Sequence, residues 1–185
     1  MLFLLILIAN DGISGYFGPA LNGTLPDKEL AVFEDITILW ITFQDALVGS
    51  VPQTLFGGGG AHFERLTDLI IQDNAFTGTI PEVGPGIPNL QLLQLNGADV
   101  TGTIPWPSII THLSSTLVKL RLGSLEYITG TLPSDIGEMT TLENLVLVNT
   151  PITGTLPPSI GLMQNMQVSE ERTSGQKGIR DVPFM

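Results

Sequence analysis

Side chains able to do catalytic or metal chemistry are few and scattered in this sequence. The two histidines have no GxSxG or HExxH pattern around them, and the chain has no cysteine for a thiolate zinc site or a disulfide framework. The candidates that we considered are His62, His112, the pair Asp68 and Asp73, and the pair Glu170 and Glu171. Catalysis needs several such groups converging on one site. We therefore predict a protein that is not an enzyme and that holds no metal or cofactor.

A run of glycines at positions 57–60 has a composition found in phosphate-binding loops. No Lys-Ser or Lys-Thr follows it, and the flanking sequence does not place it between a strand and a helix. We interpret it as a flexible surface insertion that lengthens one repeat.

Composition limits the fold and the partners. The chain has 185 residues, 43% of them hydrophobic, which is enough for one domain with a sizeable core. Its 18 acidic residues outnumber 7 basic ones, for a formal net charge of -11. Binding of nucleic acid requires clustered Lys and Arg, so we predict no nucleic-acid partner.

A short motif, Gly-x-[Ile/Leu/Val]-Pro, recurs along the chain at intervals of 24 to 29 residues. Its prolines are Pro26, Pro52, Pro81, Pro105, Pro133 and Pro157. An L-x-x-L-x-L block precedes each of the last five motifs. These blocks are Ile36/Leu39/Ile41, Leu66/Leu69/Ile71, Leu90/Leu93/Leu95, Leu117/Leu120/Leu122 and Leu142/Leu145/Leu147. One such unit cannot bury its apolar side alone, so stacked repeats are indicated.

This pattern resembles the plant-type leucine-rich repeat, LxxLxLxxNxLTGxIPxxIGxLxxLxx, over about residues 2–166. Segments such as "ITGTLPPSIGLMQNM" match its second half as well as its leucines. The resemblance implies an α/β-type solenoid, a right-handed leucine-rich-repeat superhelix with short parallel strands on the concave face and irregular or 3-10 segments on the convex side. We expect one domain of about six coils over residues 1–168, its first coil irregular, and a polar, loose tail over 169–185.

Departures from the family pattern predict irregularity. The asparagine ladder of the family corresponds here to Asn10, Gln44, Asn74, Ala98, Leu125 and Thr150, of which only two are asparagine. Residues 1–9 fit either a signal-peptide core or a first repeat strand with Leu2, Leu5 and Leu7, and we favour the strand. No cysteine-paired caps are present, which predicts self-association, or packing in a larger assembly, through uncapped ends.

The positions between the repeat leucines should point outward from the concave sheet, because successive side chains of a strand alternate between its faces. One column is Ile6, Trp40, Ile70, Gln94, Arg121 and Val146. We predict that a ligand binds on this face to Ile38, Trp40, Thr42, Phe43, Asp68, Ile70, Gln72, Gln94, Asn96, Lys119, Arg121, Asn144 and Val146. A neighbouring segment covering Trp40 is the alternative.

The leading functional prediction is a non-enzymatic recognition module that binds a protein or peptide. The repeat type is shared with receptor-kinase ectodomains and with polygalacturonase inhibitors, which implies an extracellular or membrane-associated ectodomain. Asn22, in the sequon Asn22-Gly23-Thr24, would fit such a setting as a glycosylation site.

A second hypothesis comes from the Thr-Gly-Thr triplets, which resemble the threonine faces of ice-binding solenoids. Coils spaced about 4.8 Å apart would align these threonines in two columns. The array consists of Thr77, Thr79, Thr101, Thr103, Thr129, Thr131, Thr153 and Thr155. A structural or assembly subunit that packs its ends against partners is the third hypothesis.

Overall fold

The structure is a computed structural model that describes residues 4–9, 12–16, 23–25 and 35–167, with side chains over 23–25, 35–42 and 47–167. Its strands are β1 (Leu4–Ala9), β2 (Gly12–Tyr16), β3 (Ile36–Ser50), β4 (Asp68–Thr77), β5 (Leu92–Asn96), β6 (Thr101–Thr103), β7 (Lys119–Gly123), β8 (Tyr127–Thr129) and β9 (Asn144–Val148). Its helical segments are η1 (Gln53–Phe56), α2 (Trp106–Leu113), η2 (Ile136–Glu138) and η3 (Pro158–Leu162).

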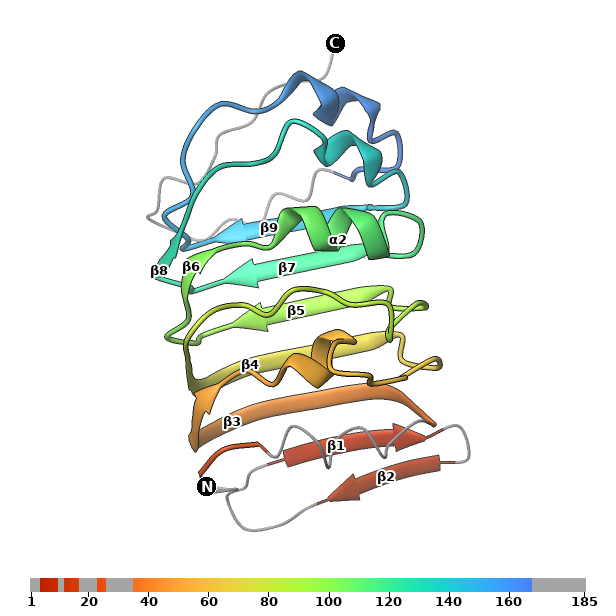
Figure 1. The fold of residues 1–185 in the computed structure, drawn as a ribbon, viewed down its shortest axis with the longest axis vertical. Helices are drawn as coiled ribbons and strands as arrows, with labels where there is room; N and C mark the ends of the chain where they lie inside the picture. The colour runs from red at the N-terminus through yellow and green to blue at the C-terminus, as the bar shows by residue number, and fades with distance from the viewer. Residues whose placement is uncertain (1–3, 10–11, 17–22, 26–34, 168–185) are drawn as a thin grey trace.

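One sheet runs the length of the molecule in the order β2-β1-β3-β4-β5-β7-β9. From β3 to β9 every neighbouring pair is parallel, so each strand belongs to a successive coil. Figure 1 shows these strands stacked along the long axis, with the helical segments crossing on one side of them. The predicted solenoid with a parallel sheet is confirmed.

The core consists of the repeated leucine positions. Ile36, Leu66, Leu90, Leu117 and Leu142 begin the five blocks, and all are buried. The two later positions of each block are also buried through β7, because period-two alternation turns them to the same side of the strand. All of these residues belong to one continuous hydrophobic cluster.

The N-terminal strand corrects the predicted first repeat. Residues 4–9 do form a strand, but β1 pairs antiparallel with both β2 and β3. The segment is therefore a hairpin at the end of the sheet, not a sixth parallel coil (Figure 1). The uninterrupted apolar run of Leu4–Ala9 fits a strand of either direction, which is why spacing alone gave the wrong polarity.

The segments opposite the sheet are mostly short 3-10 helices, as predicted, with one exception. The interval from Pro105 to Pro133 is four residues longer than its neighbours, and the added length forms the α-helix α2. Trp106, Ile109 and Leu113 of α2 are buried in the common core. An extra turn of helix thus accommodates the longer repeat without breaking the strand ladder.

The glycine run at 57–60 is a surface segment only in part: Gly59 and Gly60 are exposed as we predicted, but Gly57 is packed against the next coil. Gly57 is buried at the end of η1 in a left-handed conformation, with φ of 74°. The Gly84 amide donates to the Phe56 carbonyl at 2.7 Å, and the Gly86 amide donates to the Gly57 carbonyl at 3.1 Å. A β-carbon on Gly57 would meet the Gly86 nitrogen at 2.9 Å. The glycines let two coil backbones touch, a long-range contact that a run of glycines does not encode.

Asn74 performs the role expected of the asparagine ladder. Its buried side-chain amide donates to the Ile41 carbonyl at 3.1 Å and to the Gln72 carbonyl at 2.9 Å, which ties β3 to β4. The equivalent positions in the next two coils hold Ala98 and Leu125, both buried. Apolar packing replaces the amide there, and β5, β7 and β9 nevertheless keep a regular parallel register.

Candidate functional site

The outward side chains of the parallel strands form one surface, here called the sheet face. In register across the strands, one row contains Trp40, Ile70, Gln94, Arg121 and Val146. A second row contains Ile38, Asp68, Leu92, Lys119 and Asn144. A third contains Thr42, Gln72, Asn96, Gly123 and Val148. The sequence-predicted columns are therefore brought together in this order from β3 to β9.

The β3 end of the sheet face is apolar. Trp40 keeps 36% of its surface exposed, so it is only partly covered and remains accessible on this face. Ile38 and Ile70 flank it and are half-buried. Thr42 is only 3% exposed, between the register positions of Leu4 and Gln72, and cannot contact a ligand as we predicted. β1 flanks β3 there, and β2 is the outermost strand of the sheet. The side chain of Phe43 lies outside the described residues.

The middle of the sheet face is polar. The Gln94 amide donates to Gln72 Oε1 at 3.0 Å, and the Gln72 amide donates to Asp73 Oδ2 at 3.2 Å. Asp68 accepts a 2.6 Å hydrogen bond from the Thr67 hydroxyl. These bonds hold the amides of adjacent strands in fixed positions, where further donors and acceptors can meet a ligand.

The β7 strand gives the sheet face its positive charge. Lys119 is exposed, and Arg121 is half-buried and donates from Nε to Asn144 Oδ1 at 3.2 Å. Neither forms an ion pair within the described part of the chain. Two unneutralised cations on a protein of net charge -11 favour an acidic group on whatever binds beside them.

An open hollow of about 360 Å³ lies where the strands end on this face. Gln72, Asp73, Gln94, Asn96, Gly97, Arg121, Gly123, Ser124, Val146 and Val148 line it. The residue after the third row is left-handed in the four coils from β4 to β9, at Asp73, Gly97, Ser124 and Asn149. The sequence predicted Gln72, Gln94, Asn96, Arg121 and Val146 on this face but missed the other lining residues, among them the turn residues Asp73, Gly97 and Ser124. Their recurring type, Asp, Gly, Ser or Asn at one repeat position, was the available signal for such a turn.

The Thr-Gly-Thr triplets lie along a different edge of the coils, here called the threonine edge. All eight predicted threonines are exposed on it. The pairs in register are Ser50 with Thr77, Thr79 with Thr101, Thr103 with Thr129, and Thr131 with Thr153. Neighbouring triplets are thus offset by two residues. Equivalent threonines lie roughly 8 Å apart, not the ~4.8 Å that two straight columns require.

The threonines of this edge stabilise the stacking of coils. The Thr101 hydroxyl donates to the Gly78 carbonyl of the preceding coil at 3.0 Å, and the Thr129 hydroxyl donates to the Gly102 carbonyl at 3.3 Å. The Thr79 methyl lies 3.5 Å from where a β-carbon on Gly102 would stand. The first threonine of a triplet therefore bonds to the preceding coil, and the methyl of the second packs against the glycine of the following coil.

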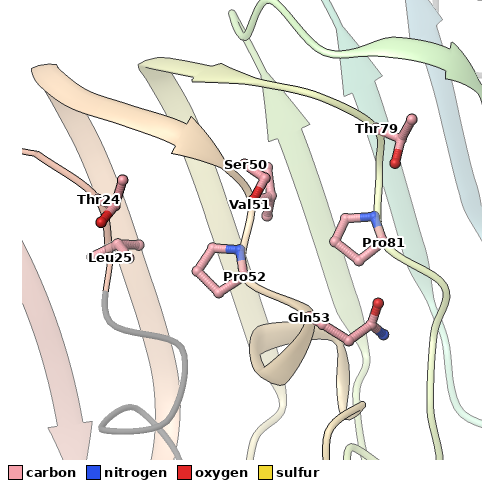
Figure 2. A pocket seen from close by; sticks show the side chains of 8 residues that line it. All are labelled: Thr24, Leu25, Ser50, Val51, Pro52, Gln53, Thr79 and Pro81. Carbon is pink, nitrogen blue, oxygen red and sulfur yellow. The ribbon is translucent and has the colours of Figure 1, made fainter.

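The threonine edge also borders a second hollow, of about 500 Å³. Figure 2 shows Thr24, Ser50 and Thr79 side by side, with Pro52 and Pro81 next to them. Thr24 lies before β3, Ser50 ends β3, and Thr79 follows β4. Leu25, Val51 and Gln53 complete the lining, which contains no charged side chain. The Gln53 amide donates to the Glu82 carbonyl at 2.6 Å and is held in place by that bond.

The remaining candidates stay apart. His62 is exposed, and His112 is in the last turn of α2. Within the described residues, no three His, Asp or Glu side chains approach closely enough to hold a metal ion. No helix there has the length and hydropathy to cross a bilayer. Asn22, Glu170, Glu171 and the tail at 169–185 lie outside the described residues.

Comparison with known proteins gives structural likenesses only. No protein-family model and no curated protein matches the sequence. The ectodomain of the Arabidopsis thaliana membrane receptor kinase GASSHO1/SCHENGEN3, solved in complex with Casparian strip integrity factor 2, matches with a TM-score of 0.66 and 28% identity. That match covers 82% of this chain and 17% of the ectodomain.

Two further structures share the fold. The Arabidopsis receptor kinase HAESA, in complex with the peptide hormone IDA and the co-receptor SERK1, matches with a TM-score of 0.65 and 26% identity, over 81% of this chain and 24% of that one. A plant ice-binding protein matches with a TM-score of 0.65 and 24% identity, over 77% and 43%. This chain thus spans less than half of each. The likeness to the ice-binding protein shows a common fold alone.

Proposed function

We propose that this chain, a leucine-rich-repeat protein of the plant type, is a non-enzymatic recognition module that binds a protein or peptide on its sheet face. One observation carries the proposal: a single row across four adjacent strands holds an exposed tryptophan, an isoleucine, a glutamine and an arginine. Unlike side chains in a fixed register offer a specific ligand a different contact on every coil.

The geometry of that row fits an extended peptide. Four adjacent strands at ~4.8 Å spacing place Trp40 about 14 Å from Arg121, a distance that about four extended residues cover. An apolar side chain would contact Trp40 and Ile70, where desolvation contributes most. An acidic group of the peptide would lie beside Lys119 and Arg121. Gln94, which lies between Ile70 and Arg121 in the row, would form a hydrogen bond with the peptide backbone.

The proposed setting is extracellular, in a secreted or membrane-associated protein. Support comes from the ectodomain structures that share the fold at 26 to 28% identity, one of them bound to a peptide hormone. Asn22 is proposed as a glycosylation site in that setting.

Selection from a library of displayed peptides tests this function. Peptides enriched on the full chain should carry an apolar residue and an acidic residue about four positions apart. The double variant Lys119→Glu/Arg121→Glu should select basic residues in place of acidic ones, because the local charge is inverted. Arg65→Glu is the matched control, since Arg65 is an exposed cation outside the sheet face that pairs with Asp35 at 3.4 Å.

Two results would contradict the proposal. The same peptides could be selected by the wild type and by the double variant, or Arg65→Glu could change the selection as much as the double variant does. Either result would place the ligand on another surface.

The threonine edge supports a second candidate function, ice binding. Eight threonines are exposed along it, and Thr79, Thr103 and Thr131 present their methyl groups beside the glycine of the next triplet. Thr79→Lys/Thr103→Lys should then abolish inhibition of ice recrystallisation, while Lys119→Glu/Arg121→Glu leaves it intact. Ice growth that is identical with and without the wild-type protein would exclude this candidate.

A further inference from the structure

The last described coil, residues 144–167, is packed less tightly than those before it. Leu145 and Leu147 are half-buried, although their counterparts Leu120 and Leu122 in β7 are 0% and 2% exposed. Ile160 of η3 is likewise only partly buried, and Leu162 is 64% exposed. The side of this coil that faces away from β7 is therefore apolar and incompletely covered by the described residues.

This coil carries no charge. Residues 144–167 include no Asp, Glu, Lys, Arg or His, whereas each earlier parallel coil contains at least one carboxylate. In a chain of net charge -11, contact between two copies through most surfaces brings carboxylates together. The terminal coil is the described surface on which two copies can meet without that repulsion.

The ladder of strands also ends here. β9 pairs with β7 on one side and is the last strand of the sheet over the described residues. The Gln167 amide donates to the Glu143 carbonyl at 2.7 Å, the bond with which each earlier coil begins its next strand.

We propose that the terminal coil is a dimerisation face, and that its occupant is the same coil of a second copy. An edge strand pairs readily with its own copy in antiparallel orientation, because a twofold axis matches each N–H with a C=O. The two sheets then continue through β9, and the two leucine rows cover one another. This gives the predicted self-association a specific surface, and it does not depend on what the sheet face binds.

Sedimentation of the full chain tests the proposal by charge insertion. The wild type is expected to dimerise, and Leu162→Glu to raise the dimer dissociation constant by more than about tenfold, since the twofold axis brings two new carboxylates to the contact. Val48→Glu is the matched control, because Val48 is 45% exposed on β3, the first strand of the parallel ladder, whereas this coil holds the last. A monomeric wild type, or equal effects of both substitutions, would overturn the proposal.

Introduced cysteines test the strand pairing itself. The chain has no cysteine, so a single cysteine at each position from 144 to 148 scans the strand. In a twofold antiparallel pair the residue on the axis lies opposite its own copy, with α-carbons ~4.5–5.5 Å apart and within disulfide range, so one of the five should cross-link far faster than Val48→Cys, which is 45% exposed on β3. No excess over Val48→Cys at any of the five positions would reject the β9 pairing. Trp40→Ala should leave dimerisation unchanged, which separates this proposal from the peptide-binding one.

Discussion

The sheet face and the threonine edge are built from the same coils, yet they use sequence in opposite ways. Along the edge one triplet repeats, and six of its eight threonines have a structural contact: a hydroxyl bond to the preceding glycine carbonyl, or a methyl packed on the following glycine. On the sheet face the row from Trp40 to Arg121 changes residue type at every strand. Its side chains are not needed for stacking and can differ from coil to coil.

The difference separates stability from recognition. Substitutions under or along the stacking contacts should lower the free energy of unfolding and leave ligand choice alone. Substitutions on the sheet face should do the reverse. Three comparisons of unfolding free energy test this difference, beginning with the variant that should lose most stability.

The largest loss is expected for Asn74→Ala. Its buried amide bonds two backbone carbonyls and links β3 to β4, so removal leaves those acceptors unpaired and should cost about 2–4 kcal/mol of unfolding free energy. Urea denaturation measures it. Asn89→Ala is the control, since Asn89 donates to the Glu64 carbonyl at 2.7 Å on the surface and should cost under ~1 kcal/mol. Equal losses of unfolding free energy in the two variants would show that the buried Asn74 amide stabilises the fold no more than a surface asparagine does.

Gly102→Ala on the threonine edge should have an intermediate effect. Gly102 has φ of 90°, which L side chains rarely adopt, whereas a β-carbon would make only ordinary contact with the Thr79 methyl at 3.5 Å. We expect a loss of about 1–3 kcal/mol, seen as a lower melting temperature. Gln94→Ala on the sheet face, also a change to alanine, should cost less than about 1 kcal/mol. The opposite ranking would mean that the edge does not hold the coils together.

The smallest effect distinguishes two threonines of one triplet. Thr101→Val removes the hydroxyl bond to the Gly78 carbonyl and should cost about 0.5–1 kcal/mol. Thr103→Val keeps the methyl that packs near Gly130, and should be close to neutral. Paired melting curves under one set of conditions resolve the difference. A larger loss for Thr103→Val would reverse the assigned roles.

Spacing in the sequence was enough to predict which residues share a row. Repeats of similar length, combined with period-two alternation, align Trp40 with Ile70 and Gln94 with Arg121, and the structure has that register. Exposure of Trp40 also followed from alternation. These features depend on local pattern, which the chain repeats five times.

The features that sequence missed depend on contacts between coils. The direction of β1 is not encoded in its apolar sequence. Gly57 contacts Gly86 only because the return segments of two neighbouring coils lie side by side. The two-residue offset of the threonine edge is likewise invisible when repeats are aligned by their motifs, since alignment matches equivalents and not hydrogen-bonded neighbours. Burial of Thr42 depends on its position beside β1, not on the sequence of its own repeat.

Ligand affinity should reside on the sheet face. Calorimetry gives the dissociation constant of a library-selected peptide for the wild type, Trp40→Ala and Thr79→Lys. Truncating a central tryptophan in a desolvated contact commonly costs about 2 kcal/mol, so Trp40→Ala should weaken binding about 30-fold, while Thr79→Lys leaves the dissociation constant unchanged. Unaltered affinity in Trp40→Ala, together with lost binding in Thr79→Lys, would contradict the claim and move recognition to the threonine edge.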